Sequence, residues 1–537
     1  MEPASEDGPA PSGPARSPWV EPGDHAGWLT GVEGLREEAA GVARRALAHR
    51  RLPPAPRLAS TVAHLGSAVG GWWLTARGTA RSRAVLAARV RRAFERLGPT
   101  YVKLAQIVSA GEGIFPAELV AEMRKCRDQV PPVAFGAIRG VVEAELGASL
   151  SETFRSFDAQ PLAAASIAQV HAAELRDGTP VVVKVQRPGI EGRVQRDVAM
   201  MAWLAERLVG RIPVAALANP PGLVEVFAET IVEELDFRLE AAHMLEVAGV
   251  LAAMGQDQLV VPRPHRELVT RRVLVMERLF GLPWGDGQVL RQAGVDPEAA
   301  LRVALVSLLE GAMVAGVFHG DLHGGNLVVL RDGRVGLLDF GITGRLGPAE
   351  RRALVRLLLA VTTNDVAGQV EALQTLGALP ADRTTAEVIA ALGLDRPPLD
   401  PLTVSVEELV AEVRQVVSAL LGLGARLPKA LVLFVKDLVF LDGALAAMAP
   451  DLDVLAEVVG LVRYFQTRHG AQLAADLGMD PAAPVPVDLA GVAASFGAPG
   501  ATSGLTVAEL NARRREVRTR LEAWRSGGGR GDAAERS

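Results

Sequence analysis

Residues 319–326 read His-Gly-Asp-Leu-His-Gly-Gly-Asn, and Asp339-Phe340-Gly341 follows a little later in the chain. Two apolar runs, 327–330 and 334–338, lie between these motifs and flank the turn Arg331-Asp332-Gly333. Apolar runs on either side of an Asp-Gly turn are typical of a β-hairpin. The sequence therefore predicts two polar loops that are joined by a hairpin.

These two loops contain the residue types that phosphoryl transfer uses. The reaction depends on positioning and on neutralisation of charge, which metal-bound carboxylates supply. Asp321 and Asn326 can place one group beside an attacking nucleophile and the other on a metal, and Asp339 can bind metal that bridges the phosphates. Each piece alone is commonly structural, since Asp332-Gly333 is an ordinary turn. Together they predict a kinase-type site in which Asp321 is catalytic and Asn326 and Asp339 are metal ligands.

A kinase-type site also needs a lysine on a strand to bind the nucleotide phosphates. Lys184 lies in the alternating run Thr179–Gln186, on the face opposite three valines. We expect it to bind phosphates; the alternative is a solvent-facing lysine on an edge strand. Met276 and Glu277 end a second Val-rich run, 272–276, and are expected to form the hinge that lines an adenine slot.

The segment before this lysine departs from ordinary kinases, whose nucleotide loop reads G-x-G-x-x-G. The corresponding positions here are Ala163, Ala164, Ala165 and Ser166. Alanine does not readily adopt the positive φ angles open to glycine, so we expect a tight turn in which Ser166 offers a hydroxyl. No Ala-Pro-Glu follows the Asp-Phe-Gly motif, so we expect the peptide-docking platform of protein kinases to be absent.

The periodicity of apolar residues divides the chain. Between about 150 and 285 the apolar residues alternate with a period of two, apart from a helical insertion that includes 225–244. After 285 their spacing is mostly that of helices. This pattern predicts an α+β fold in which a small sheet-bearing lobe precedes a helical lobe. The insertion is acidic, and we expect Glu229, Glu233, Glu234 and Asp236 to lie on one helix. Its glutamates are candidates for the one that holds the strand lysine.

Five segments are expected. They are a disordered tail and short helix (1–55), a helical extension (56–135), the sheet-bearing lobe (136–282), the helical lobe (283–470), and a Pro/Ala/Gly-rich linker followed by an amphipathic helix (471–537). That last helix should begin with a capping box, Thr506-x-x-Glu509.

Composition narrows the classes of protein further. The 537 residues are 49% hydrophobic, carry a net charge of −5 and include one cysteine, Cys126. A single cysteine allows no intramolecular disulfide, and a slightly acidic chain does not favour nucleic acid as a partner. The N-terminus lacks the pattern of a secretory signal, and the uncharged windows 58–76 and 489–508 are interrupted by glycine and polar residues. We expect a cytoplasmic protein without membrane spans.

Two basic stretches could contact an anionic surface. Seven arginines against one glutamate lie between Trp72 and Arg96, and the final helix has six arginines against three glutamates. Cationic amphipathic helices with tryptophan suit the surface of an anionic membrane. The alternative is a solvated helix or one that docks on a protein partner.

The chain resembles the UbiB/AarF-type atypical kinases, also called the ADCK family, over roughly residues 80 to 450. The resemblance is carried by the stretches 97–106, 183–189, 234–236, 276–277, 319–326 and 339–341, together with the Ala-rich loop. It implies a bilobal protein-kinase-like fold whose α-helical N-terminal extension folds over the active site and blocks peptide substrates. It also implies ATP and Mg²⁺ as cofactors.

The resemblance assigns further roles residue by residue. Lys103 and Gln106 match the gating motif K-x-G-Q of the extension, in which Ala105 replaces the glycine. Glu234 matches the first residue of the family's E-x-D pair and is therefore our choice for the glutamate of the site. The Ala163–Ser166 segment matches the nucleotide loop.

These expectations lead to a Mg²⁺-dependent atypical kinase or ATPase that acts in isoprenoid quinone or other lipid metabolism. Its expected partners are ATP, an isoprenoid lipid or quinone precursor, and the inner face of the cell membrane, where it would bind peripherally. One alternative is a pseudokinase scaffold for biosynthetic partners. A weaker one is a small-molecule phosphotransferase of the aminoglycoside or choline kinase type.

Overall fold

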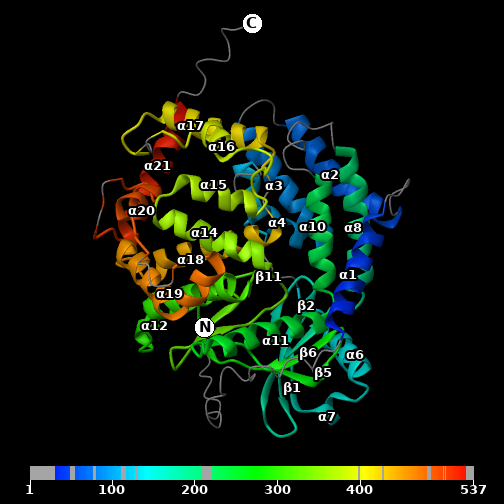
Figure 1. Ribbon diagram of the computed structural model, residues 1–537. Helices are drawn as coiled ribbons and strands as arrows, with labels where there is room; N and C mark the ends of the chain where they lie inside the picture. Colours follow the sequence, from blue (N-terminus) through cyan, green and yellow to red (C-terminus); the bar gives the residue numbers. More distant parts are fainter. Residues whose placement is uncertain are drawn as a thin grey trace.

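The computed structural model describes residues 31–48, 55–75, 80–110, 116–126, 131–208, 220–396, 400–425, 428–480, 485–499, 501 and 503–527. The expected N-terminal tail falls outside these residues. Within them the chain forms a small sheet-bearing lobe, a helical lobe and a layer of N-terminal helices (Figure 1). This arrangement confirms the predicted α+β, kinase-like fold class.

The small lobe is built on a five-stranded antiparallel sheet of order β1-β2-β3-β6-β5. The strands are β1 (Phe154–Ala164), β2 (Ala168–Leu175), β3 (Pro180–Gln186), β5 (Pro264–Val269) and β6 (Val273–Glu277). On β3, Val181, Val183 and Val185 are fully buried in one cluster with helix α6 (Phe135–Leu146). The short α7 (Leu150–Thr153) leads into β1. The predicted alternation therefore leaves Lys184 on the other face of the sheet.

The helical insertion is confirmed, but the prediction that its acidic residues 229–236 lie on one helix is wrong. Two helices, α10 (Pro220–Glu233) and α11 (Phe237–Met254), are separated by a turn at residues 234–236. The Asp236 side chain accepts a hydrogen bond from the backbone N–H of Arg238 and so caps α11. An aspartate that satisfies a helix N-terminus in this way ends any continuous helix through its position. The acidic stretch thus occupies a turn as well as a helix.

The predicted hairpin is confirmed and is part of the second sheet. Strands β9 (Leu327–Leu330) and β10 (Val335–Leu337) pair antiparallel, and Gly333 in the turn has φ of 86°. Strand β4 (Leu259–Val260) borders β10, and β7 (Gly281–Pro283) borders β9. A separate pair, β8 (Val317–His319) and β11 (Thr343–Arg345), sets His319 opposite Thr343. This pair brings the two polar loops together.

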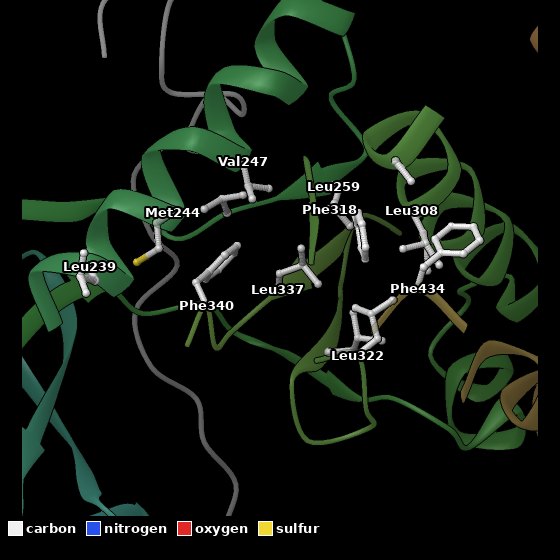
Figure 2. Close-up of a cluster of buried hydrophobic side chains, with 14 of the residues drawn as sticks. Leu239, Met244, Val247, Leu259, Leu308, Phe318, Leu322, Leu337, Phe340 and Phe434 are labelled. Carbon is white, nitrogen blue, oxygen red and sulfur yellow. The ribbon is translucent and has the colours of Figure 1, made fainter. Parts of the chain in front are cut away.

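Helices form the rest of the helical lobe. They are α12 (Gly287–Gln292), α13 (Pro297–Glu310), the π-helical turn η2 (Gly311–Ala315), α14 (Pro348–Thr362), α15 (Val366–Thr375), α16 (Thr385–Leu392), α17 (Val406–Gly422), α18 (Lys429–Met448) and α19 (Val454–Leu477). A continuous apolar core joins α11, α13 and α18 to the loops of the site. Figure 2 shows Phe318, Leu322, Leu337 and Phe340 within this core. The ring of Phe318 packs edge to face on that of Phe434 of α18, with 5.8 Å between the ring centroids.

The N-terminal layer contains α1 (Val32–Leu47), α2 (Ala55–Thr75), α3 (Ala80–Leu97), α4 (Pro99–Ala110) and α5 (Ala117–Met123), and it packs beside α8 (Ile190–Leu208) and α10 (Figure 1). Arg57 of α2 pairs with Asp197 of α8, whose side chain is fully buried. Among the described residues, no helix is long and apolar enough to cross a membrane.

The C-terminal part differs from the expected linker. Helix α20 (Leu489–Ser495) lies within it, and Val492 and Ala493 are buried against Leu455 and Leu510. The capping box of the last helix, α21 (Val507–Gly527), is confirmed by hydrogen bonds between Thr506 and Glu509.

Three of the six arginines of α21 bind other parts of this chain. Arg513 pairs with Asp400, Arg514 pairs with Asp442, and Arg520 donates to backbone carbonyls at 401, 402 and 404. These contacts attach α21 to the helical lobe of its own chain.

Candidate active site

Lys184 stands at the centre of the site and contacts two carboxylates. Its Nζ lies 2.7 and 2.9 Å from the two side-chain oxygens of Glu240 and 3.2 Å from Oδ2 of Asp339. Burial alone would lower the pKa of Lys184, but the charges of Asp339 and Glu240 raise it above its ordinary value. The residue is therefore an ammonium group held between α11 and the Asp-Phe-Gly loop, and not the solvent-facing lysine of the alternative interpretation.

The choice of Glu234 as the partner of Lys184 is wrong, because Glu240 occupies that place. Glu234 lies in the turn before α11, and its Oε1 forms an ion pair with Nζ of Lys103 at 2.8 Å. Asp236, which caps α11, sets where the helix begins and so places Glu240 in its first turn, opposite β3. Two glutamates six residues apart thus hold two different lysines.

Lys103 brings the N-terminal extension into the site. Burial opposes its charge, but Glu234 and, more weakly, Asp321 and Asp339 raise the pKa of Lys103. Gln106 lies one turn further along α4 and is half-buried. Ala105 is fully buried among the side chains between α4 and α5 and sits in regular helix, so alanine at this gating-motif position requires no positive φ.

Helix α11 also holds the backbone around the Asp-Phe-Gly loop. Nδ1 of His243 is hydrogen-bonded to the carbonyl of Phe340 at 2.9 Å, and burial lowers the pKa of this histidine to about 3, so its ring is neutral. One turn further, Glu246 pairs with Arg345 of β11. Together with Glu240, these residues set the position of Asp339 relative to Lys184.

The loop at 319–326 holds Asp321 and Asn326 beside the Asp-Phe-Gly motif. His319 contacts the carbonyl of Asp339, which ties the two loops together. The amide nitrogen of Asn326 donates to the carbonyl of Asp321 at 3.0 Å, which leaves the amide oxygen available as a ligand. The carboxylate of Asp321 contacts Lys436 of α18. Burial opposes ionisation of Asp321, but Lys436 and Lys103 hold its pKa below the ordinary value.

The donor set fits a magnesium ion bound together with a nucleotide. Mg²⁺ usually takes one or two carboxylates plus substrate phosphates, rather than a cage made only of protein groups. Asp339 has a side chain that is 44% exposed, and Lys184 and Lys103 keep its pKa below the ordinary range. Asn326 would supply the second ligand. In the described part of the chain, no group of three or more His, Cys, Asp or Glu forms a separate metal cluster.

The Ala-rich segment 163–166 consists of the end of β1 and the turn that leads to β2. Ala163 and Ala165 are exposed, whereas Ser166 as a whole is buried. A role of its hydroxyl at a nucleotide stays a prediction. Arg187 holds the turn: its side chain donates to the carbonyl of Ala165 and its backbone N–H donates to the carbonyl of Ile167, both at 2.9 Å. The loop is thus shaped by an arginine just beyond β3 rather than by glycines.

Met276 and Glu277 end β6, where they pair with Val182 and Val181 of β3. Met276 is buried in the main core, and the backbone N–H of Glu277 donates to the carbonyl of Arg263. They thus lie at the end of the last strand, in chain order, of the five-stranded sheet, while the hinge role and an adenine contact stay predictions.

Sequence reasoning missed Glu240, Lys436 and Asp437. Glu240 could have been found from the capping aspartate four residues earlier, which marks a helix start. Lys436 and Asp437 lie 115 residues beyond the loop that they contact and belong to no motif. Only the packing of α18 against the loop reveals them.

Comparison with known proteins gives consistent results. Residues 125–373 match the sequence model of the ABC1 atypical kinase-like domain family. An uncharacterized aarF domain-containing protein kinase of Arabidopsis thaliana, named as chloroplastic, is 33% identical over 395 residues, which cover 68% of this chain and 73% of the relative. An uncharacterized protein of Mycobacterium tuberculosis is 37% identical over 372 residues, with 68% and 75% covered.

Two further similarities were found. A probable protein kinase UbiB of Cellvibrio japonicus is 32% identical over 378 residues, which cover 68% of this chain and 67% of that one. A solved structure, the complex of Rv3197 with erythromycin from Mycobacterium tuberculosis, aligns with a TM-score of 0.38 and 24% identity over 61% of this chain and 89% of that chain. The matched domain and the extent of the sequence relatives show that the chain belongs to the ABC1 atypical kinase-like family, with the proteins named UbiB and aarF.

Proposed function

We propose that this protein binds Mg²⁺–ATP between its two lobes and transfers the terminal phosphoryl group, to a small molecule or to water. The observation that carries the proposal is the bridge formed by Lys184 between Glu240 and Asp339. A cation on the sheet and a carboxylate on the facing loop are the groups that neutralise nucleotide phosphates and hold their metal. When bound, the metal would supply charge neutralisation at those phosphates, with Asn326 and Asp339 as its ligands.

The chain's own residues have separate tasks in this scheme. Lys184 binds phosphate oxygens, and Asp321 accepts the proton of the attacking hydroxyl or water. Lys103 of the N-terminal layer is held in the same site by its ion pair with Glu234. The layer therefore covers part of the site, which supports a small acceptor rather than a peptide.

The test is nucleotide binding measured by calorimetry with and without Mg²⁺. Asp339→Asn should abolish or greatly weaken Mg²⁺-dependent binding, because it removes the charged ligand. Asp332→Asn, in the exposed hairpin turn, is the matched control and should bind as wild type does. Unchanged binding by Asp339→Asn would count decisively against the site.

A pseudokinase scaffold is the second candidate, favoured by one observation. Lysines already pair with Asp321, Glu234 and Asp339, an arrangement that a protein without turnover could also keep. ATP turnover, measured with and without anionic liposomes, separates the two functions. If turnover is absent under both conditions and Asp321→Asn behaves as wild type does, the protein is a scaffold.

We also propose that the protein acts in isoprenoid quinone or lipid metabolism and rests against the inner face of the cell membrane through α2 and α3. Arg83, Arg92 and Arg96 of α3 are exposed, and Val62 and Val69 of α2 are 57% and 50% exposed. Each basic residue near an anionic surface contributes about 1 kcal/mol. The double variant Arg92→Glu/Arg96→Glu should lose cosedimentation with anionic liposomes, whereas Arg514→Glu on α21 should retain it. Equal retention would refute this surface.

A further inference from the structure

The loop that contains Asp321 has no lysine or arginine of its own. Between residues 317 and 330 there is neither lysine nor arginine. A carboxylate that accepts a proton next to a polyanionic nucleotide needs a nearby cation to keep its charge and direction. The ion pair of the Asp321 carboxylate is formed with a lysine from another part of the chain.

Lysine is rare in this protein, and most of it lies at the site. The chain has 52 arginines but only five lysines, and three of these, Lys103, Lys184 and Lys436, contact the carboxylates described above. Lys103 and Lys184 are held by Glu234 and Glu240. Lys436 is the lysine whose ion pair is formed with Asp321 itself.

Helix α18 is docked directly on the loop, which gives Lys436 a fixed base. A side chain at Gly320 would meet Cδ1 of Leu433 at 3.1 Å, so the helix approaches the loop backbone closely. Phe434 packs edge to face on Phe318 just before the loop. The helix is thus anchored on the residues that precede Asp321.

The next residue of α18 anchors the loop on the other side of Asp321. Asp437 is fully buried, and its Oδ1 accepts a hydrogen bond from the backbone N–H of Leu322 at 2.9 Å. Burying a carboxyl group is costly unless it is hydrogen-bonded. The hydrogen bond of Asp437 fixes the peptide that follows Asp321. Adjacent residues of α18 therefore hold the side chain and the backbone of the same two-residue stretch.

We propose that Lys436 and Asp437 of α18 are positioning residues for Asp321. Lys436 aims the Asp321 carboxylate and balances its charge, and Asp437 fixes the backbone that bears it. The inference rests on the proposed function, in which the acceptor oxygen bonds to the terminal phosphorus, its proton passes to Asp321, and ADP leaves with the electron pair of the broken P–O bond.

The experiment compares steady-state ATP turnover of four full-length proteins: wild type, Lys436→Met, Lys436→Arg and Lys429→Met. Misplacing a reacting group by about 1 Å costs on the order of 10²-fold in rate. Lys436→Met should therefore lower kcat about 100-fold with little change in KM for ATP. Lys436→Arg keeps the charge and should recover most of the loss. Lys429 is an exposed lysine at the start of the same helix, and Lys429→Met should behave as wild type does.

The outcomes separate this inference from the proposed function. If wild type turns ATP over and Lys436→Met is equally fast or faster, Lys436 does not position Asp321 and the inference is overturned. A rise in KM without a fall in kcat would also overturn it, because Lys436 would then bind nucleotide. If wild type shows no turnover, the proposed transfer itself fails and the inference falls with it. The side chain of Lys436 is 25% exposed, and equal urea midpoints for the four proteins would exclude misfolding.

Discussion

Replacing Glu240 by glutamine tests how Lys184 is held. In the wild-type site the ammonium group is shared between Glu240 and Asp339. The variant removes the charge of Glu240 and leaves one amide oxygen that can accept from Lys184. Lys184 would then pair mainly with Asp339, the carboxylate that the metal requires. We therefore expect weaker binding of Mg²⁺–ATP.

The two contacts of 2.7 and 2.9 Å set the size of the effect. A hydrogen bond to a charged group contributes about 1.5–3 kcal/mol. Each 1.4 kcal/mol is about tenfold in affinity, so loss of one such bond should weaken Mg²⁺–ATP binding by about 10- to 100-fold. Titration calorimetry at constant Mg²⁺ measures this directly, and urea unfolding checks that both proteins are folded.

Glu234→Gln is the matched control, because Glu234 is equally buried but contacts Lys103. It should bind Mg²⁺–ATP no more weakly than wild type. If Glu234→Gln weakens binding more than Glu240→Gln does, the assignment of the two glutamates is reversed. Wild-type affinity in Glu240→Gln would refute the role of the pair altogether.

Three further predictions concern stability. Burial raises the pKa of Asp437 to about 8. Between the ordinary pKa of an aspartate and this value, the folded protein holds a proton that the unfolded chain releases. The free energy of unfolding therefore falls as pH rises through this window. Asp437→Asn should reduce the difference between urea midpoints at about pH 6 and about pH 9; an undiminished difference would contradict this. Arg57→Met should lower the free energy of unfolding by about 3–5 kcal/mol, because it leaves buried Asp197 without its guanidinium partner, and unchanged denaturation would contradict the pairing. Thr506→Ala removes an acceptor for the Glu509 N–H and should cost about 1 kcal/mol, seen as faster hydrogen exchange in the first turn of α21, and equal exchange would show that the cap is dispensable.

Local chemistry was sufficient to predict the parts of the site that lie in continuous sequence. The hairpin at 327–338 follows from apolar runs around an Asp-Gly turn, and the side on which Lys184 projects follows from the alternation of β3. The order of Asp321, Asn326 and Asp339 around that hairpin predicts that all three lie in one region.

The remainder depended on contacts that no local pattern encodes. The acidic stretch offered several glutamates, and only the capping of α11 by Asp236 decides that Glu240 faces Lys184. Lys436 reaches Asp321 because α18 returns to the loop after 115 residues, which is a matter of topology. Helix α20 was missed because its small residues resemble a linker until they are packed against α19.

The scarcity of lysine makes the lysines of the site selective targets for chemical labelling. An amine-directed acylating reagent would find almost no competing side chains outside the site: Lys125 is 60% exposed and Lys429 is exposed, whereas Lys103 and Lys184 are 18% and 11% exposed. Lys125 and Lys429 should react first and provide an internal reference for the rate of acylation. Protection of the inner lysines, read by mass spectrometry, would then report occupancy of the candidate active site without any knowledge of the acceptor.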